Sequence, residues 1–257
     1  MRTEPCIRRK KKLKQQNTIK MSMKIRDILA VGLRGVTPEG GWSEDILEED
    51  CIHTLVAVHT DEGLTGFGSV YTNDALVRAA LGVLEPLYRG ENALEPERVS
   101  EKLRQSMFWM GRGGSIEHTI SGIDIALWDI LGKATGQPVG RLLGGRYRER
   151  VMPYASLLME EPGRLAEHLL YLKAQGFRAF KMGWGPFGRE SHALDEAIVR
   201  AARDAIGPDD LLTVDAGGSD AFWPNGYKWA LRTSYMLADY DVAWFEEPLK
   251  PDALRDY

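Results

Sequence analysis

The stretch "LLTVDAGGS" (Leu211–Ser219) is an apolar run that stops on an acid, Asp215, and then turns at two glycines. The stretch "VAWFEEP" (Val242–Pro248) repeats the arrangement and stops on Glu246 and Glu247. Uninterrupted apolar runs of this length are typical of parallel β-strands, because helices cover both faces of a parallel sheet. The carboxyl ends of such strands face the active-site mouth of a βα barrel. The sequence therefore predicts that Asp215 and Glu246 lie at this edge.

The pattern around these two strands is an alternation of strands and amphipathic helices over residues 151–257. The strand "FRAFKMGW" (Phe177–Trp184), for example, is followed by the helical stretch "SHALDEAIVRAARDAIG" (Ser191–Gly207). Such alternation predicts parallel βα units. A TIM-type α/β barrel has eight of these units in about 250 residues. Residues 151–257 have room for about the first four units, the first half of such a barrel.

Residues 23–150 have a different organisation. The stretch "KIRDILAVGLRGV" (Lys24–Val36) is rich in β-forming residues, and "TLVAVHTDEGLTGFGSVY" (Thr54–Tyr71) is typical of a hairpin. Helical patterns follow, the longest with Ile120, Ile123 and Leu127 at helical spacing and Gly136 as a stop. Strands followed by helices predict an α+β domain that ends in a linking helix.

The charge is distributed unevenly along the chain of 257 residues, which has a net charge of −4. Residues 1–22 contain eight Lys or Arg and one acid, Glu4, and we expect a disordered basic extension, with a nucleic-acid-binding arm as the alternative. The remainder is acidic, which disfavours nucleic acid as a partner. With no long apolar window and no signal-peptide core, we expect neither a membrane partner nor secretion. The two cysteines, Cys6 and Cys51, do not form the spaced pattern of a disulfide framework, which favours a reducing compartment such as the cytoplasm.

Three residues at the predicted strand ends form a candidate site. Asp215 and Glu246 end neighbouring strands, and carboxylate oxygens favour a hard cation, Mg²⁺ before Zn²⁺. Lys181, on the strand before them, is a candidate catalytic residue or anion ligand. The ordinary alternative is that the acids cap the next helices and Lys181 is an ion-pair partner. We expect the tryptophans of the helices and the last strand in the core rather than at a cofactor, namely Trp109, Trp128, Trp229 and Trp244.

Three stretches together resemble the enolase superfamily, in its mandelate racemase/muconate lactonizing enzyme branch. They are "SGIDIALWDILGKATGQPVGRLLGG" (Ser121–Gly145), "GFRAFKMG" (Gly176–Gly183) and the pair of strand ends "VDAGG" and "WFEEP". The resemblance covers about residues 23–257 and implies an α+β capping domain that closes over a modified TIM barrel. It also implies a Mg²⁺ ion that holds a substrate carboxylate while a base removes the α-proton, giving an enediolate.

Residue by residue, the resemblance makes Asp215 and Glu246 metal ligands and Lys181 the first lysine of a catalytic pair. It also makes Trp42 a candidate substrate contact, in a loop that closes over the substrate. The second lysine of the pair is replaced by Gly183. Further departures are Gly217, where the family has an asparagine, and a longer loop within "DAFWPNGYKW" (Asp220–Trp229).

These departures favour dehydration of a sugar acid, because a dehydratase does not need acid/base groups on both faces of its substrate. The alternatives are a racemase or epimerase of a 2-hydroxy acid, and a non-catalytic fragment. The resemblance further implies that the chain is truncated at its C-terminus and inactive by itself, with the third metal ligand and any catalytic histidine beyond Tyr257. A full-length protein of this kind is expected to be a homo-oligomer that acts on a small carboxylate.

Overall fold

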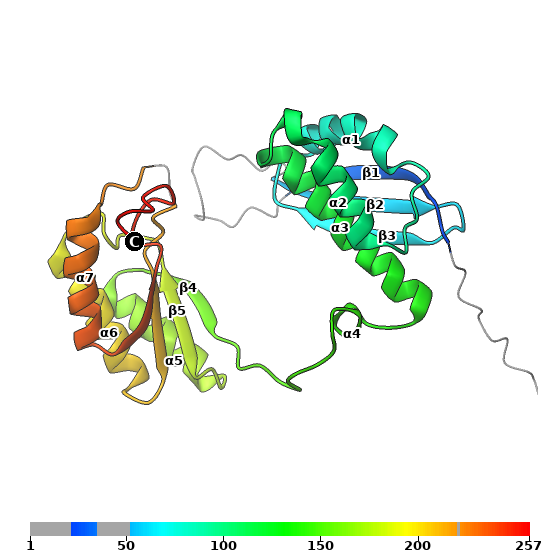
Figure 1. Ribbon diagram of the computed structural model, residues 1–257. Coiled ribbons are helices and arrows are strands. Elements are labelled where there is room, and N and C mark those ends of the chain that lie inside the picture. Colours follow the sequence, from blue (N-terminus) through cyan, green and yellow to red (C-terminus); the bar gives the residue numbers. More distant parts are fainter. Residues whose placement is uncertain (1–21, 35–51, 220–221) are drawn as a thin grey trace, which may run out of the picture. The chain divides into compact units, whose positions relative to one another are not determined.

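The computed structural model describes residues 22–34, 52–219 and 222–257, which belong to two compact units, Met1–Tyr147 and Arg148–Tyr257. The first unit has a sheet of three strands and the second a sheet of four, and Figure 1 shows the strands and helices of each unit. The predicted basic extension, residues 1–22, lies outside the described residues except for Ser22. No helix in the described ranges has the length and apolar character needed to cross a bilayer.

The first unit is an antiparallel sheet covered by helices. Its strands lie in the order β1 (Ile25–Leu33), β2 (His53–Thr60), β3 (Thr65–Val70). The helical elements that follow are α1 (Asp74–Tyr88), α2 (Pro96–Ser106), the 3₁₀ turn η2 (Phe108–Met110), α3 (Gly114–Thr135) and α4 (Val139–Leu142). This is the α+β capping domain that the sequence predicts.

Glycines let the long helix α3 pack directly on the sheet. A Cβ atom on Gly68 of β3 would lie 2.1 Å from the carbonyl oxygen of Gly122 in α3, so the two backbones touch. The helical spacing predicted for α3 is confirmed, because Ile120, Ile123 and Leu127 are fully buried in one core cluster. Gly136 ends the helix with φ +65°, in the left-handed conformation that glycine favours.

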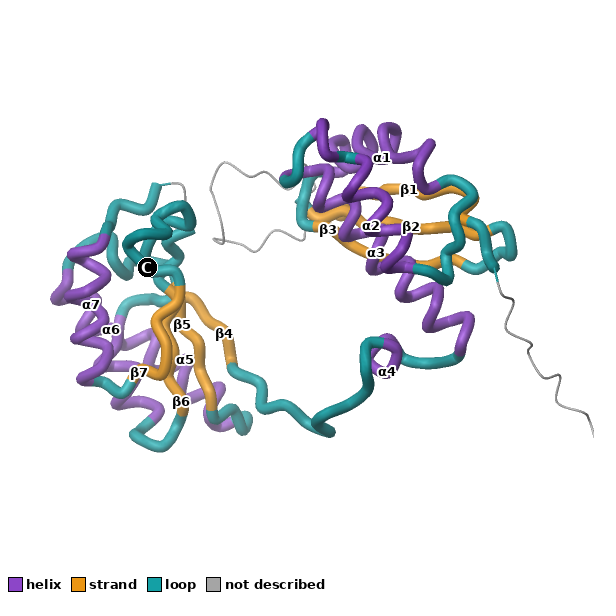
Figure 2. The backbone as a smooth tube through the Cα atoms, viewed as in Figure 1, coloured by secondary structure: helices purple, strands orange, loops and turns teal. Residues whose placement is uncertain are grey.

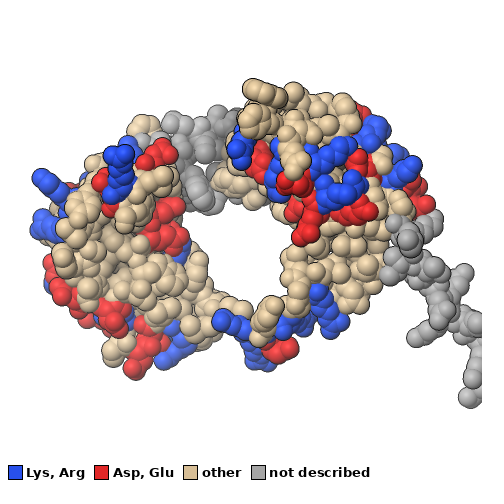
Figure 3. Space-filling model, in the orientation of Figure 1, with Lys and Arg blue, Asp and Glu red and all other residues tan. Residues whose placement is uncertain are grey.

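The outer surface of these helices is charged in both signs. Figure 3 shows Lys and Arg side chains mixed with Asp and Glu over this part of the molecule. Many of them form ion pairs, such as Lys102 with Glu91 at 2.6 Å and Arg104 with Glu117 at 2.9 Å. A surface of mixed charge is typical of solvated helices.

The second unit contains four parallel strands with three helices between them, so the described residues include three of the four predicted strand–helix units and the strand of the fourth. Strands β4 (Ala155–Leu158), β5 (Ala179–Gly183), β6 (Leu211–Asp215) and β7 (Val242–Glu246) pair in that order, and every pair is parallel. The helices between them are α5 (Pro162–Ala174), α6 (His192–Ile206) and α7 (Tyr227–Asp239). Figure 2 shows these helices packed alongside the strands. The unit fits a partial α/β barrel.

The two faces of the parallel sheet differ sharply. Side chains such as Phe180, Met182 and Val214 are fully buried against the helices. On the other face, the strand register aligns Lys181 with Ser156 and Thr213, and Asp215 with Gly183 and Glu246. Because side chains alternate between the two faces of a strand, the candidate residues share the face that a barrel turns inward.

The prediction that the tryptophans are core residues is wrong for two of them. Trp109 is 91% exposed on η2, and Trp244 is 40% exposed on β7. Trp229 does pack against the core of the second unit. The error for Trp109 arises because its segment turns as a short 3₁₀ element instead of continuing α2, so the ring is not directed toward the α2 core face. Trp244 lies on the same strand face as Glu246, two residues away.

Candidate active site

Lys181, Asp215 and Glu246 come from three consecutive strands and meet in one cluster. Lys181 Nζ lies 2.8 Å from Asp215 Oδ2 and 2.9 Å from Glu246 Oε1. Lys181 therefore reaches past β6 to an acid on β7. The Lys181 and Asp215 side chains are 15% and 10% exposed, while Glu246 is 38% exposed, so the cluster opens to solvent on the Glu246 side.

The ammonium of Lys181 is stabilised in its charged form. Burial lowers the pKa of Lys181, but the hydrogen bonds and negative charges of Asp215 and Glu246 raise it more, so the net pKa lies well above the ordinary lysine value. With one cation facing two carboxylates, the cluster has one negative charge in excess. An additional cation would be attracted to it.

The carboxylates are also oriented by contacts outside the ion pair. The backbone N–H of Gly217 donates to Asp215 Oδ1 at 3.1 Å, so both oxygens of this carboxylate are engaged. The indole N–H of Trp244 donates to Glu246 Oε2 at 3.3 Å. Glu247 stays outside the cluster, since its carboxylate accepts a hydrogen bond from the Ser219 hydroxyl at 2.7 Å.

The cluster offers the carboxylate oxygens that a magnesium site uses, but it contains only two acids, Asp215 and Glu246. Within residues 22–34, 52–219 and 222–257, no group of three or more His, Cys, Asp or Glu side chains is arranged to hold a metal. Mg²⁺ commonly keeps several waters and binds through one or two carboxylates together with the substrate. The two carboxylates of Asp215 and Glu246 would therefore suit a Mg²⁺ ion.

Gly183 leaves no space for the second lysine of the pair. A Cβ atom at this position would lie 2.9 Å from both the Cβ and the carbonyl oxygen of Asp215 on the neighbouring strand. Real Cβ atoms do not approach other atoms so closely, so a lysine here would require the two strand ends to move apart. The sequence shows the glycine, but only the structure shows that Asp215 of the neighbouring strand fills its place.

Sequence reasoning missed Trp184, which follows Gly183 at the end of β5. Its backbone has φ +60°, which is uncommon for a non-glycine residue, and its N–H donates to the Asp215 carbonyl at 3.1 Å. The available signal was the sequence "GWG" (183–185), an aromatic residue between two glycines at a strand end. Trp42, the predicted substrate contact, lies outside the described residues.

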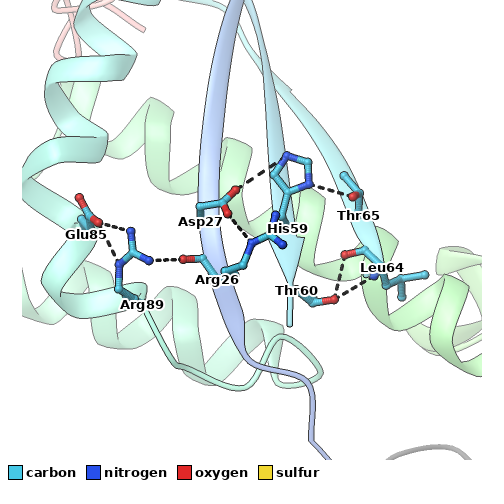
Figure 4. Close-up of polar contacts among 8 residues, drawn as sticks. All are labelled: Arg26, Asp27, His59, Thr60, Leu64, Thr65, Glu85 and Arg89. Atoms are coloured by element: carbon cyan, nitrogen blue, oxygen red, sulfur yellow. Dashed lines mark hydrogen bonds and ion pairs between the residues drawn. The ribbon is translucent and has the colours of Figure 1, made fainter. Parts of the chain in front are cut away.

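A second polar cluster lies on the antiparallel sheet of the first unit. Figure 4 shows His59 between Thr65 and Asp27: His59 Nδ1 is 2.9 Å from the Thr65 hydroxyl, and Nε2 is 3.9 Å from Asp27 Oδ1. The Asp27 carboxylate is paired with Arg26 at 2.6 Å. Because the His–Asp distance is too long for a hydrogen bond, these residues do not form a hydroxyl–His–Asp relay.

Two family descriptions match the chain, one in each unit. Residues 49–144 match the mandelate racemase/muconate lactonizing enzyme N-terminal domain, and residues 164–257 match the enolase C-terminal domain-like family. The chain belongs to the mandelate racemase/muconate lactonizing enzyme branch of the enolase superfamily. The capping domain and the partial barrel are therefore the two domains of this family.

Individual members of this branch are similar to the chain over most of its length. It is 35% identical over 216 residues to a D-galactarolactone cycloisomerase from Agrobacterium fabrum, covering 80% of this chain and 53% of that protein. It is 33% identical over 215 residues to a D-xylonate dehydratase from Haloferax volcanii, covering 77% of this chain and 51% of that protein. The chain thus spans about half the length of these two relatives.

A solved structure shows the same fold. The 3,6-anhydro-D-galactonate cycloisomerase from Zobellia galactanivorans superposes with a TM-score of 0.76 at 30% identity, over 91% of this chain and 61% of that one. The shared region includes the cap and the βα units that position Lys181, Asp215 and Glu246.

Proposed function

We propose that the protein carries out Mg²⁺-dependent removal of the proton α to a carboxylate through an enediolate, and that the overall reaction is dehydration of a sugar acid. The observation that carries the proposal is the placement of Lys181 between two strand-end carboxylates, Asp215 and Glu246. The relatives named as a sugar-acid dehydratase and as cycloisomerases support this class of substrate. The partner is therefore a small carboxylate molecule.

Asp215 and Glu246 would hold the cation. Their excess negative charge attracts it, and the Gly217 N–H and Trp244 indole keep the two carboxylates oriented. A bound Mg²⁺ ion would supply positive charge where the substrate carboxylate gains negative charge as the α-proton leaves. This charge compensation is needed because the α-proton of a carboxylate is very weakly acidic.

Lys181 would move the proton. While it faces two carboxylates, Lys181 stays protonated and has no electron pair free to accept a proton, because Asp215 and Glu246 raise its pKa. When a bound cation compensates the charge of these carboxylates, they raise the pKa of Lys181 less, while burial continues to lower it. Lys181 is then closer to the pKa range that suits general acid–base catalysis.

The proposed dehydration is balanced in atoms and electrons. The α-carbon loses a proton to the base and the β-carbon loses its hydroxyl, which takes up a proton and leaves as water. The resulting enol becomes a 2-keto-3-deoxy acid without an oxidant or reductant. Gly183 favours this reaction over racemisation. A racemase needs acid/base groups on both faces of the substrate, and Gly183, the next position after Lys181 on the same face of strand β5, has no side chain to supply one of them.

The test is proton exchange and product formation by the full gene product, including any residues that its gene encodes beyond Tyr257. The protein is incubated in D₂O with Mg²⁺ and either D-xylonate or a panel of other sugar acids, and NMR follows the α-proton and the products. We expect deuterium exchange or loss of the α-proton together with a 2-keto-3-deoxy acid. Both should disappear in Lys181→Met and persist in Lys102→Met, a control at an ion-paired lysine of the cap.

Two outcomes would contradict the proposal in different ways. Exchange with inversion at the α-carbon, and no keto acid, would identify a racemase or epimerase. No exchange with any acid of the panel would contradict proton abstraction itself and favour a non-catalytic protein.

A further inference from the structure

Trp184 is held in an unusual position next to the candidate metal ligands. It is partly buried, its backbone is in the left-handed region at φ +60°, and its N–H donates to the carbonyl of Asp215. A non-glycine residue is rarely found in this region of backbone space, and such residues concentrate at functional sites. The left-handed turn directs the ring toward the end of the neighbouring strand β6.

The indole lies over Gly217, which has no side chain to exclude it. A Cβ atom on Gly217 would lie 2.8, 3.0 and 3.1 Å from three carbons of the Trp184 ring, Cδ2, Cε2 and Cε3. Gly217 also donates its N–H to Asp215 Oδ1. Gly217 thus donates its backbone N–H to the Asp215 carboxylate and also supports the aromatic ring, so the ring lies beside the strand end that carries this carboxylate.

The loop that begins with Trp184 is fixed at its far end. The Gly188 N–H donates to the buried carboxylate of Asp195 at 2.8 Å, and the Gly188 carbonyl accepts from the Asn225 side chain at 2.5 Å. A Cβ atom on Gly188 would lie 2.6 Å from the ring of Trp223, which is itself only 2% exposed. These contacts hold the loop in one place, so the indole is a preformed surface.

The same loop borders open space. Gly185 and Pro186 line a hollow in the surface together with Glu161, which follows β4. Trp184 comes directly before Gly185 in the chain and directly after β5, the strand that carries Lys181.

We propose that Trp184 is a specificity-determining residue, whose indole forms an apolar wall of the substrate site and packs against the C–H face of a sugar-acid chain. This inference rests on the proposed function. A polyhydroxylated chain has C–H bonds between its hydroxyls, and an indole offers a large flat surface with a polar N–H at one edge. Binding sites of this kind are lined by aromatic side chains with a few polar groups that fix orientation.

The test compares Trp184→Ala, Trp184→Phe and Gly217→Ala in the full gene product, with Mg²⁺ and D-xylonate or the best acid of the panel. We expect Trp184→Ala to raise KM by about tenfold or more with a much smaller change in kcat, in the range typical of lost apolar contacts in a specificity pocket. Trp184→Phe should restore part of the loss. The ranking of the acids in the panel should also change, which a purely structural role would not produce.

Gly217→Ala tests the placement of the ring. The new methyl group would displace the indole, so this variant should raise KM in the same direction as Trp184→Ala, and the double variant should be little worse than either single one. Gly63→Ala is the matched control, because Gly63 has a similar φ of +79° but no atom within 4 Å of its added Cβ. It should show the backbone strain without the change in KM.

Several results would overturn the inference. If the unsubstituted protein turns over an acid and Trp184→Ala has the same KM and the same ranking, Trp184 is not a substrate contact, while the proposed function stands. Additive effects of Gly217→Ala and Trp184→Ala would show that the ring does not act from its place over Gly217. If the unsubstituted protein neither binds nor converts any acid, the proposed function fails and the role of Trp184 fails with it.

Discussion

The two edges of the parallel sheet contain opposite charge arrangements. At the edge where the strands begin, the fully buried side chain of Asp210 lies between two cations, 3.1 Å from Lys173 Nζ and 2.7 Å from Arg178 Nε. At the edge where the strands end, Lys181 lies between two acids, Asp215 and Glu246. One edge has one acid for two cations, and the other has one cation for two acids.

The difference separates a structural cluster from a site with chemical capacity. At the first edge, the second cation has a structural role, because Lys173 also donates a hydrogen bond to the carbonyl of Ile206 at 2.5 Å. At the second edge, the excess charge is negative, and the cluster is accessible to solvent beside Glu246. Carboxylates that are oriented but not fully neutralised can bind a further cation. We therefore propose that the charge balance, rather than the number of ion pairs, distinguishes the edge that binds a cation.

The largest expected effect is on turnover. Lys181→Met should lower turnover of a sugar acid by a factor of about 100 or more, as expected for a lost catalytic acid or base. Lys173→Met, at the other edge, should leave turnover close to that of the unsubstituted protein. The measurement is the steady-state rate with Mg²⁺, and a Lys181→Met protein with ordinary turnover would show that Lys181 is only an ion-pair partner.

The next effect is on stability and falls at the opposite edge. Asp210→Asn should lower the free energy of unfolding by about 1 to 3 kcal/mol, because it leaves two cations beside a buried group that can no longer neutralise them. The partly exposed side chains of Lys173 and Arg178 keep the loss below that of a fully buried pair. Urea unfolding measures it, and an unchanged midpoint would mean that this cluster does not stabilise the fold.

A smaller effect is expected in alkaline solution. The folded pKa of Lys181 is raised above the ordinary value of 10.5, so its contribution to stability is fully present below pH 10.5 and is lost as the pH rises through the folded pKa. We expect this loss to be of the order of 1 kcal/mol. Unfolding curves above pH 10.5 should fall more steeply for the unsubstituted protein than for Lys181→Met. Parallel curves would contradict the raised pKa.

The smallest effect on folding is expected for Trp42. If Trp42 contacts the substrate, Trp42→Ala should change KM or substrate preference while altering the free energy of unfolding by no more than about 0.5 kcal/mol, as for a surface position. Kinetics and thermal unfolding of the same preparation give both numbers. A large loss of stability with unchanged kinetics would make Trp42 a core residue instead.

Local sequence patterns were sufficient for the βα units and the strand-end acids. Asp215 and Glu246 each follow an apolar run, and the parallel order of the strands brings them to one edge. The link from Lys181 to Glu246 was not predictable, because it passes β6 and depends on how the strands are arranged in space. The position of Trp184 was missed because it depends on a left-handed backbone and on the absence of a side chain at Gly217.

The most direct test of the central claim is a calorimetric titration with Mg²⁺ of the full gene product and two matched variants, Asp215→Asn and Asp210→Asn. Each variant replaces one buried acid by its neutral isostere, at opposite edges of the same sheet. We predict that Asp215→Asn weakens Mg²⁺ binding at least about tenfold, in line with the loss of a charged ligand. We predict that Asp210→Asn binds Mg²⁺ as the unsubstituted protein does. Equal Mg²⁺ affinity in all three proteins would contradict the assignment of a cation site to the carboxyl edge.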